Sequence, residues 1–105
     1  MTDLAGPAGL IVRVNANGSI RRMEHGDVVL NLFPGSEVEG GPANLYLRLL
    51  RDEIVATPLL GPESPLAFRS DERGMQAAGE WQGLHVSLSL VLAQSAPAWF
   101  WHVAV

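Results

Sequence analysis

The longest alternating run in this chain, Leu84–Leu92, limits most strongly what the chain can fold into. Apolar side chains recur there at every second position, which places five of them on one face: Leu84, Val86, Leu88, Leu90 and Leu92. A period of two is typical of a β-strand with one buried face, whereas a helix needs a period near 3.6. Shorter alternating runs lie at 10–15 and 44–50. The chain is therefore predicted to be all-β.

Turn signals separate these runs at a spacing of roughly ten residues. Asn17-Gly18 is the strongest hairpin signal, because both residues tolerate the positive φ of a tight turn. Gln82-Gly83 and Asp71–Gly74 mark further turns. We count about nine short strands, which predicts an antiparallel β-sandwich. The sandwich is expected to span residues 10–105, after a loose lead-in over residues 1–9.

Composition excludes several classes of function. A length of 105 residues fits one domain, and the absence of cysteine excludes disulfides and zinc–thiolate sites. The net charge of −4 argues against a nucleic-acid partner, which would require a basic face. The sequence has no apolar run long enough for a membrane span and no start typical of a signal peptide. We therefore expect a cytoplasmic protein.

The surface and the C-terminal run point to a larger assembly. Only 17% of the residues are charged and 48% are hydrophobic, so some apolar surface is expected to be covered by a partner or another domain. Pro97–Val105 is an aromatic, β-branched run, and a strand this apolar needs neighbours on both sides. We expect the chain to be a fragment or the N-terminal domain of a longer protein.

Two pairs of residues could carry chemistry. His25 and Asp27 flank a glycine and could form a general-base pair or hold a metal, but a turn stabilised by the aspartate is the favoured interpretation. Glu37 and Glu39 would point the same way in an extended segment, as in a shared cation site or an acid–base pair. A solvated loop is the more common outcome for such a pair.

The remaining candidates lie on predicted strands. Ser87 and Ser89 share the face of His85, but no acid completes a triad, so ordinary surface serines are favoured. Trp81, Trp99 and Trp101 could stack on sugar rings, although burial against another segment is favoured. We assign no catalytic residue, no cofactor and no metal to the chain.

Several segments resemble a known family. The stretch from His25 to Phe33 and the stretch from Glu37 to Arg48 are similar to the N-terminal β-sandwich region of glycoside hydrolase family 94, formerly glycosyltransferase family 36. This family includes cellobiose and β-1,2-oligoglucan phosphorylases and the phosphorylase-like part of cyclic β-1,2-glucan synthases. Thr57–Pro62, Trp81–Val86 and Trp99–Val103 fit the same pattern. The resemblance covers most of the chain from about Ile11.

The resemblance implies part of a β-supersandwich that precedes an (α/α)6 barrel. In the family, the barrel carries the aspartate general acid and the phosphate site, which have no counterpart in this chain. The implied function is a non-catalytic accessory domain of a glycoside phosphorylase. The loop 37–44 and the polar face of Asn44, Tyr46 and Arg48 would then contact the barrel or a glycan.

Two alternatives stay open. A stand-alone carbohydrate-binding module would require solvent-exposed tryptophans. An oligomerisation or scaffold domain would pair its aromatic end strand with a second copy. The expected partners are accordingly a downstream catalytic domain or a second copy of the chain, with a β-glucan oligosaccharide as a possible ligand.

Overall fold

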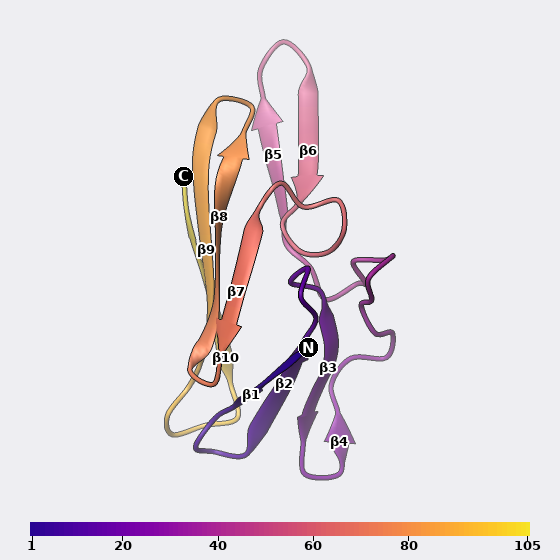
Figure 1. Cartoon of the computed structure of the whole chain (residues 1–105), viewed down its shortest axis with the longest axis vertical. Helices are drawn as coiled ribbons and strands as arrows, with labels where there is room; N and C mark the ends of the chain where they lie inside the picture. The colour runs from indigo at the N-terminus through magenta and orange to yellow at the C-terminus, as the bar shows by residue number, and fades with distance from the viewer.

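The computed structural model describes all 105 residues as strands and loops, with no helix (Figure 1). The structure therefore offers no helix that could cross a membrane. All paired strands are antiparallel, which confirms the all-β prediction. There are ten strands where the sequence predicted about nine: β1 (Thr2–Ala5), β2 (Leu10–Val14), β3 (Ile20–His25), β4 (Val28–Val29), β5 (Tyr46–Leu50), β6 (Ile54–Pro58), β7 (Ala67–Asp71), β8 (Gly74–Trp81), β9 (Leu84–Leu92) and β10 (Trp99–Ala104).

Strands β1 to β4 form the first sheet, in the order β1-β2-β3-β4, which we call the N-terminal sheet. The predicted Asn17-Gly18 turn joins β2 to β3. Gly18 has a φ of 80°, and its N–H donates to the carbonyl oxygen of Asn15 at 2.9 Å. A side chain at this position would be strained, which explains why a glycine stands there.

Strands β7 to β10 form the C-terminal sheet, a meander in the order β10-β9-β8-β7. Tight turns fix its register. Gln82 and Gly83 both have positive φ, at 52° and 78°, as a two-residue hairpin turn requires. Asp71 stabilises the preceding turn, because its side chain accepts hydrogen bonds from the N–H groups of Arg73 and Gly74. The face predicted for β9 is confirmed, since Val86, Leu88, Leu90 and Leu92 are buried and Leu84 is half-buried.

The two four-stranded sheets enclose one core, as in a small sandwich. Both sheets and the proline-rich loop after β6 contribute buried side chains: Leu4, Leu10, Val12, Val14, Ile20 and Met23 from the N-terminal sheet, Met75, Ala77, Val86, Leu88, Leu90 and Leu92 from the C-terminal sheet, and Leu59, Leu60 and Leu66 from the loop. The loop thus fills the space between the sheets at one end of the core.

The segment 1–9 was expected to be a loose lead-in, but its residues 2–5 form strand β1 of the first sheet. Strand β1 pairs with β2, with Thr2 opposite Val14 and Leu4 opposite Val12. Leu4 has 0% of its surface exposed. Hydrogen bonds from Gly6 N to Leu10 O and from Gly9 N to Gly6 O close the turn that folds β1 back onto β2. Burial of Leu4 and pairing with β2 therefore order this segment.

Strands β5 and β6 form a separate hairpin that projects beyond the two sheets, at the top of Figure 1. The alternation predicted for residues 44–50 is present, since Leu47 and Leu49 are half-buried while Tyr46 and Arg48 are exposed. The hairpin makes the molecule elongated, with extents of 47 × 24 × 20 Å.

Candidate functional site

The site residues predicted from the sequence do not form one site. Glu39, Asn44 and Tyr46 line a cleft of about 310 Å³ between the loop 37–44 and the loop that follows β6. Glu37 and Arg48 are exposed but lie outside the lining of this cleft. The structure thus brings together only part of the predicted polar set.

Glu37 and Glu39 lie in a tight turn and not in an extended segment. The hydroxyl oxygen of Ser36 accepts hydrogen bonds from the N–H groups of Val38 and Glu39, and Ser36 N donates to Glu39 O at 2.8 Å. The extended geometry that would align the two carboxylates is therefore absent. No group of three or more His, Asp or Glu side chains is placed so that it could hold a metal ion.

Asn44 fastens two loops together. Its side-chain oxygen accepts from Leu45 N at 2.8 Å and from Leu60 N at 3.0 Å, and its side-chain nitrogen donates to Leu60 O at 3.0 Å. These contacts occupy most of the hydrogen-bonding capacity of the amide. Asn44 therefore positions the cleft and has little capacity left for a ligand.

Replacing Asn44 with alanine is expected to lower the free energy of unfolding by about 1–3 kcal/mol, because Leu60 N–H and C=O lose their partners in a partly buried place. Chemical denaturation followed by circular dichroism measures this change. Glu39→Ala is the control within the same cleft. Glu39 is exposed and its side chain makes no ion pair, so this variant should change the stability by less than about 0.5 kcal/mol. Equal stabilities for the two variants would contradict a fastening role for Asn44.

All three tryptophans point to the core side of the C-terminal sheet. Trp99 and Trp101 are on β10, and Trp81 is the last residue of β8. Trp101 pairs with Leu90 and Trp99 with Leu92, so both point to the face that carries the core, while Phe100 points to the opposite face. Trp81 and Trp101 are half-buried and pack against the core, and Trp99 is 36% exposed. Figure 1 shows β10 as the edge strand of this sheet.

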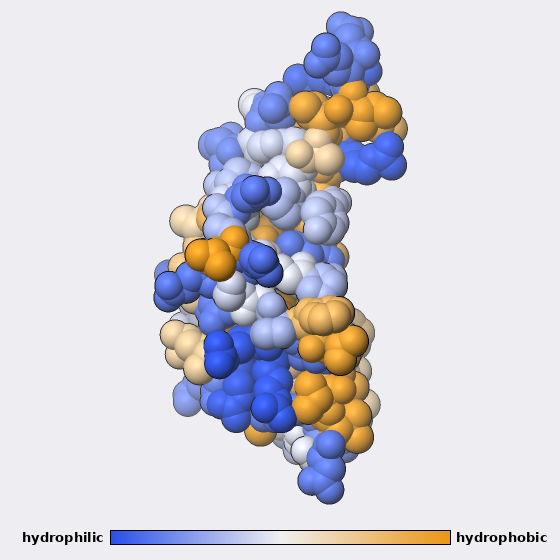
Figure 2. Space-filling model, turned by 90° about the vertical axis from the view of Figure 1, so that its right-hand side faces the viewer, coloured by the Kyte–Doolittle hydropathy of each residue, from blue (hydrophilic) through white to orange (hydrophobic).

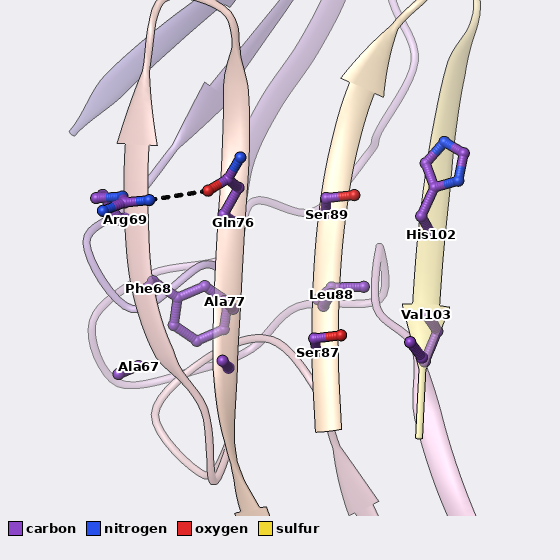
Figure 3. Close-up of a pocket in the computed structure, with 12 residues that line it drawn as sticks. Ala67, Phe68, Arg69, Gln76, Ala77, Ser87, Leu88, Ser89, His102 and Val103 are labelled. Carbon is purple, nitrogen blue, oxygen red and sulfur yellow. Dashed lines mark hydrogen bonds between the residues drawn. The ribbon is translucent and has the colours of Figure 1, made fainter. Parts of the chain in front are cut away.

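A second hollow, larger than the cleft beside Asn44, lies on the other face of the C-terminal sheet, which we call the outer face. It is a groove of about 620 Å³, and residues of all four strands line it (Figure 3). Small side chains form its floor, in one row across the sheet: Ala67, Ala78, Ser87 and Ala104. Because these side chains are short, the groove is open across the full width of the sheet.

A row of polar side chains borders this floor. Arg69 pairs with Gln76, Gln76 with Ser89, and Ser89 with His102, so the four side chains stand side by side on neighbouring strands. Arg69 Nη2 donates to Gln76 Oε1 at 3.0 Å, as the dashed line in Figure 3 shows. Arg69 takes part in none of the ion pairs of the structure, so its other N–H groups face solvent.

Glu80 and His85 lie in the next row of the outer face, beyond the floor, and do not line the groove. These residues pair across β8 and β9, and His85 Nδ1 lies 3.1 Å from Glu80 Oε1. Both side chains are well exposed. The groove itself thus has a guanidinium, an amide, a hydroxyl and an imidazole along one side, and seven of its twelve lining residues are hydrophobic.

Sequence reasoning identified Ser87, Ser89 and His85 on one face but missed Arg69, Gln76 and His102 as their neighbours. The lengths of the turns already indicate which of these residues lie side by side. A two-residue turn between Asp71 and Gly74 places Arg69 opposite Gln76, and the Gln82-Gly83 turn places Gln76 opposite Ser89. Only the six-residue link from β9 to β10 leaves the position of His102 open, because such a loop does not fix a register.

Comparison with known proteins assigns the chain to a family. No curated protein matches the chain. The sequence profile of the SOGP N-terminal domain matches residues 13–105, which covers the C-terminal sheet, the projecting hairpin and the N-terminal sheet from the end of β2 onward. The family name refers to the N-terminal region of sophorooligosaccharide (β-1,2-glucan) phosphorylases, which are part of the glycoside hydrolase family 94-like phosphorylases. A match over this share of the sequence shows that the chain belongs to the SOGP N-terminal domain family.

Proposed function

We propose that the chain is a non-catalytic accessory domain of a SOGP-type glycoside phosphorylase and that it supports a separate (α/α)6 catalytic barrel. The family match supports the enzyme class. The observation that carries the supporting role is the amount of apolar surface that this fold leaves uncovered. The barrel itself is inferred from the resemblance to glycoside hydrolase family 94.

The total accessible surface is larger than that of a typical folded monomer of this size, and many large apolar side chains lie on it. The accessible area is 6496 Å², whereas a folded monomer of this mass exposes about 5,700 Å². Figure 2 shows hydrophobic side chains gathered near the upper end, where the β5–β6 hairpin lies, and along one edge of the lower half. Contiguous apolar patches of this kind mark interaction surfaces.

Two segments contain eight of the fifteen large apolar residues that are exposed. The first is β4 with the loop that follows it, where five large apolar side chains are exposed: Val28, Val29, Leu30, Leu32 and Phe33. The second is the β5–β6 hairpin, where Tyr46, Leu50 and Ile54 are exposed. An isolated two-stranded hairpin is only marginally stable in water, so a partner that packs on it would stabilise it.

The isolated chain is expected to release no glucose 1-phosphate from sophorooligosaccharides and phosphate, because the proposed catalytic groups belong to the barrel.

The chain should bind the catalytic region of a SOGP-type phosphorylase, produced separately and without its own N-terminal domain. Binding should raise the thermal midpoint of that region. Titration calorimetry and thermal unfolding measure both effects. Binding is expected to weaken at least about tenfold in the double variant Leu50→Ser with Ile54→Ser, which removes large side chains from the hairpin.

Val91→Ser is the matched control, because Val91 is an exposed apolar residue on a different face. This variant should bind the catalytic region as tightly as the unchanged chain. Turnover that persists through further purification of the isolated chain would contradict a non-catalytic domain. An absence of binding to the catalytic region would contradict the supporting role.

A further inference from the structure

We infer that two copies of this chain pair edge to edge through β10, so that their C-terminal sheets join into one antiparallel sheet. This pairing is separate from the proposed function, because it needs no catalytic region. Three features of β10 support it: a free backbone edge, the absence of charged residues, and the fit of the strand to a second copy of itself.

Strand β10 has an open backbone edge. It lies at one end of the sheet order β10-β9-β8-β7 and pairs only with β9 (Figure 1). Ala93 N donates to Ala98 O at 2.8 Å, and these two residues extend the ladder between β9 and β10 by one pair. Hydrogen-bonded and non-hydrogen-bonded pairs alternate along an antiparallel ladder, so the even-numbered residues of β10 bond to β9. The N–H and C=O groups of Trp99, Trp101 and Val103 therefore point to the open edge.

The other outer strands are protected against pairing, whereas β10 is not. Soluble proteins protect exposed strand edges with charged residues or proline, or keep the edge strand very short. Strand β4 has only two residues. Each of the remaining outer strands has a charged residue or a proline: Asp3 on β1, Arg48 on β5, Pro58 on β6, and Arg69 with Asp71 on β7. Strand β10 is six residues long and contains no proline and no Asp, Glu or Arg.

Large apolar side chains are exposed on both faces of β10. On the core face, Trp99 is 36% exposed and Val103 is 43% exposed, and Trp101 between them packs against the core. On the outer face, Phe100 is 53% exposed. A strand added beside β10 would cover part of these side chains and extend the core past the present edge. Burial of apolar surface would therefore add to the new backbone hydrogen bonds.

The strand fits a second copy of itself. A two-fold axis perpendicular to the sheet makes the two β10 strands antiparallel and keeps both core faces on the same side. With Trp101 opposite the same residue of the second copy, Trp99 lies opposite Val103 and Phe100 lies opposite His102. The core face then matches apolar with apolar side chains, and the outer face matches two rings. The residues whose N–H and C=O groups point to the edge become the hydrogen-bonded pairs of the new ladder.

Charge does not oppose this pairing, although each chain has a net charge of −4. Neither β10 nor β9 contains Asp, Glu or Arg. His102 is the one titratable side chain of β10, and in this register it lies beside Phe100 and not beside a second histidine. Glu80 is on β8, two strands from the edge, at about 10 Å. Salt at about 0.1 M screens charges over a similar distance, so repulsion across the joint is weak.

Sedimentation equilibrium of the isolated chain tests the pairing. A six-residue ladder buries less area than the roughly 1,600 Å² of a standard interface, so we expect a dimer that dissociates on dilution. The apparent mass should rise from the 11.3 kDa of one chain toward twice that value as the concentration increases.

Amide hydrogen exchange identifies the edge that pairs. The N–H groups of Trp99, Trp101 and Val103 should become protected as the chain concentration rises, because they bond to the second copy. The N–H groups of Phe100 and His102 bond to β9 and should be protected at every concentration. This alternation is specific to strand pairing, since association through side chains elsewhere would not protect every second amide of β10.

Two valine variants form a matched pair. Val103→Lys places a charge at the joint and should weaken dimerisation at least about tenfold. Val91→Lys makes the same replacement on β9, which is not an edge strand, at a residue with nearly the same exposure (41% against 43%), and should leave dimerisation unchanged. Val103→Pro removes one outward N–H and keeps an apolar side chain, so it should also weaken dimerisation. Circular dichroism checks that each variant remains folded.

Three results would overturn the pairing. The first is a mass of one chain over the whole concentration range, the second is equal association of the Val103→Lys and Val91→Lys variants, and the third is a dimer without alternating protection in β10. If the alternating protection appears only when the catalytic region is added, the edge binds that region and not a second copy. The hairpin variant Leu50→Ser with Ile54→Ser should dimerise like the unchanged chain, so the pairing and the supporting role fail separately.

Discussion

Replacing Leu90 with alanine is expected to lower the free energy of unfolding by about 2–5 kcal/mol. Leu90 has 0% of its surface exposed and lies in the middle of the C-terminal sheet, between Met75 on β8 and Trp101 on β10. Met75 is also fully buried, and Trp101 packs on the same core. The β-strand backbone around Leu90 is hydrogen-bonded on both sides, so it cannot collapse to fill the resulting cavity. The loss is therefore expected in the upper part of this range.

Val91→Ala is the control, and it changes the very next residue. Val91 points to the outer face and is 41% exposed, so its truncation should cost less than about 1 kcal/mol. Denaturant unfolding of the two variants by circular dichroism measures both values. The large expected difference between neighbouring residues follows from the period of two. Similar losses in both variants would show that β9 does not present alternate faces to the core and to solvent.

The period of two predicted the burial pattern of β9 because successive side chains of a strand point to opposite faces of the sheet. Each apolar residue from Val86 to Leu92 at even positions lies in the core, and His85 and Ser89 point away from it. The Asn17-Gly18 and Gln82-Gly83 turns were likewise predictable, since positive φ is a local property. Much of the fold class is therefore encoded in short segments of the sequence.

Strand β1 could not be predicted in the same way. Residues 2–5 contain one large apolar side chain, Leu4, so they show no alternation. Their order comes from pairing with β2 and from the burial of that one leucine under the C-terminal sheet. Both contributions are tertiary, and neither leaves a local signal. The turn at Ser36 is different, because its hydroxyl accepts from the N–H groups of residues only two and three positions on, Val38 and Glu39. Serine turns of this kind are a local signal, which the prediction of an extended segment did not use.

The groove was only partly predictable for a related reason. A polar residue at an outward position of a strand looks the same whether it faces open solvent or borders a hollow. Arg69 and Gln76 become a pair only when the register is known, and His102 joins their row only through the pairing of β10 with β9. From the sequence, sugar stacking was therefore considered only for the tryptophans, and burial was favoured for them. The structure places Trp99 and Trp101 on the face opposite the groove.

Replacing Gly61 with alanine is expected to lower the free energy of unfolding by about 3 kcal/mol or more. Gly61 has a φ of 97°, which strains any other residue, and an added Cβ would lie 2.5 Å from the Cα of Gly40. The clash is with backbone, so no side-chain rotation can relieve it. Gly61 N also donates to Asn17 O at 3.0 Å, and Asn17 contacts Ser36 O through its side-chain nitrogen at 2.8 Å. A shift of Gly61 would therefore disturb three loops at the end of the core.

Gly83→Ala separates the clash from the strain. Gly83 also has a positive φ, at 78°, but nothing lies within 4 Å of an added Cβ, so this variant should cost only about 1–2 kcal/mol. Thermal unfolding of both variants measures the difference, with each kcal/mol expected to lower the midpoint by about 4–8 °C in a domain of this size. Equal midpoints would mean that the loops around Gly40 and Gly61 can separate freely. In that case the proline-rich loop would not be held against the Asn17 turn, and the cleft beside Asn44 would have no fixed shape.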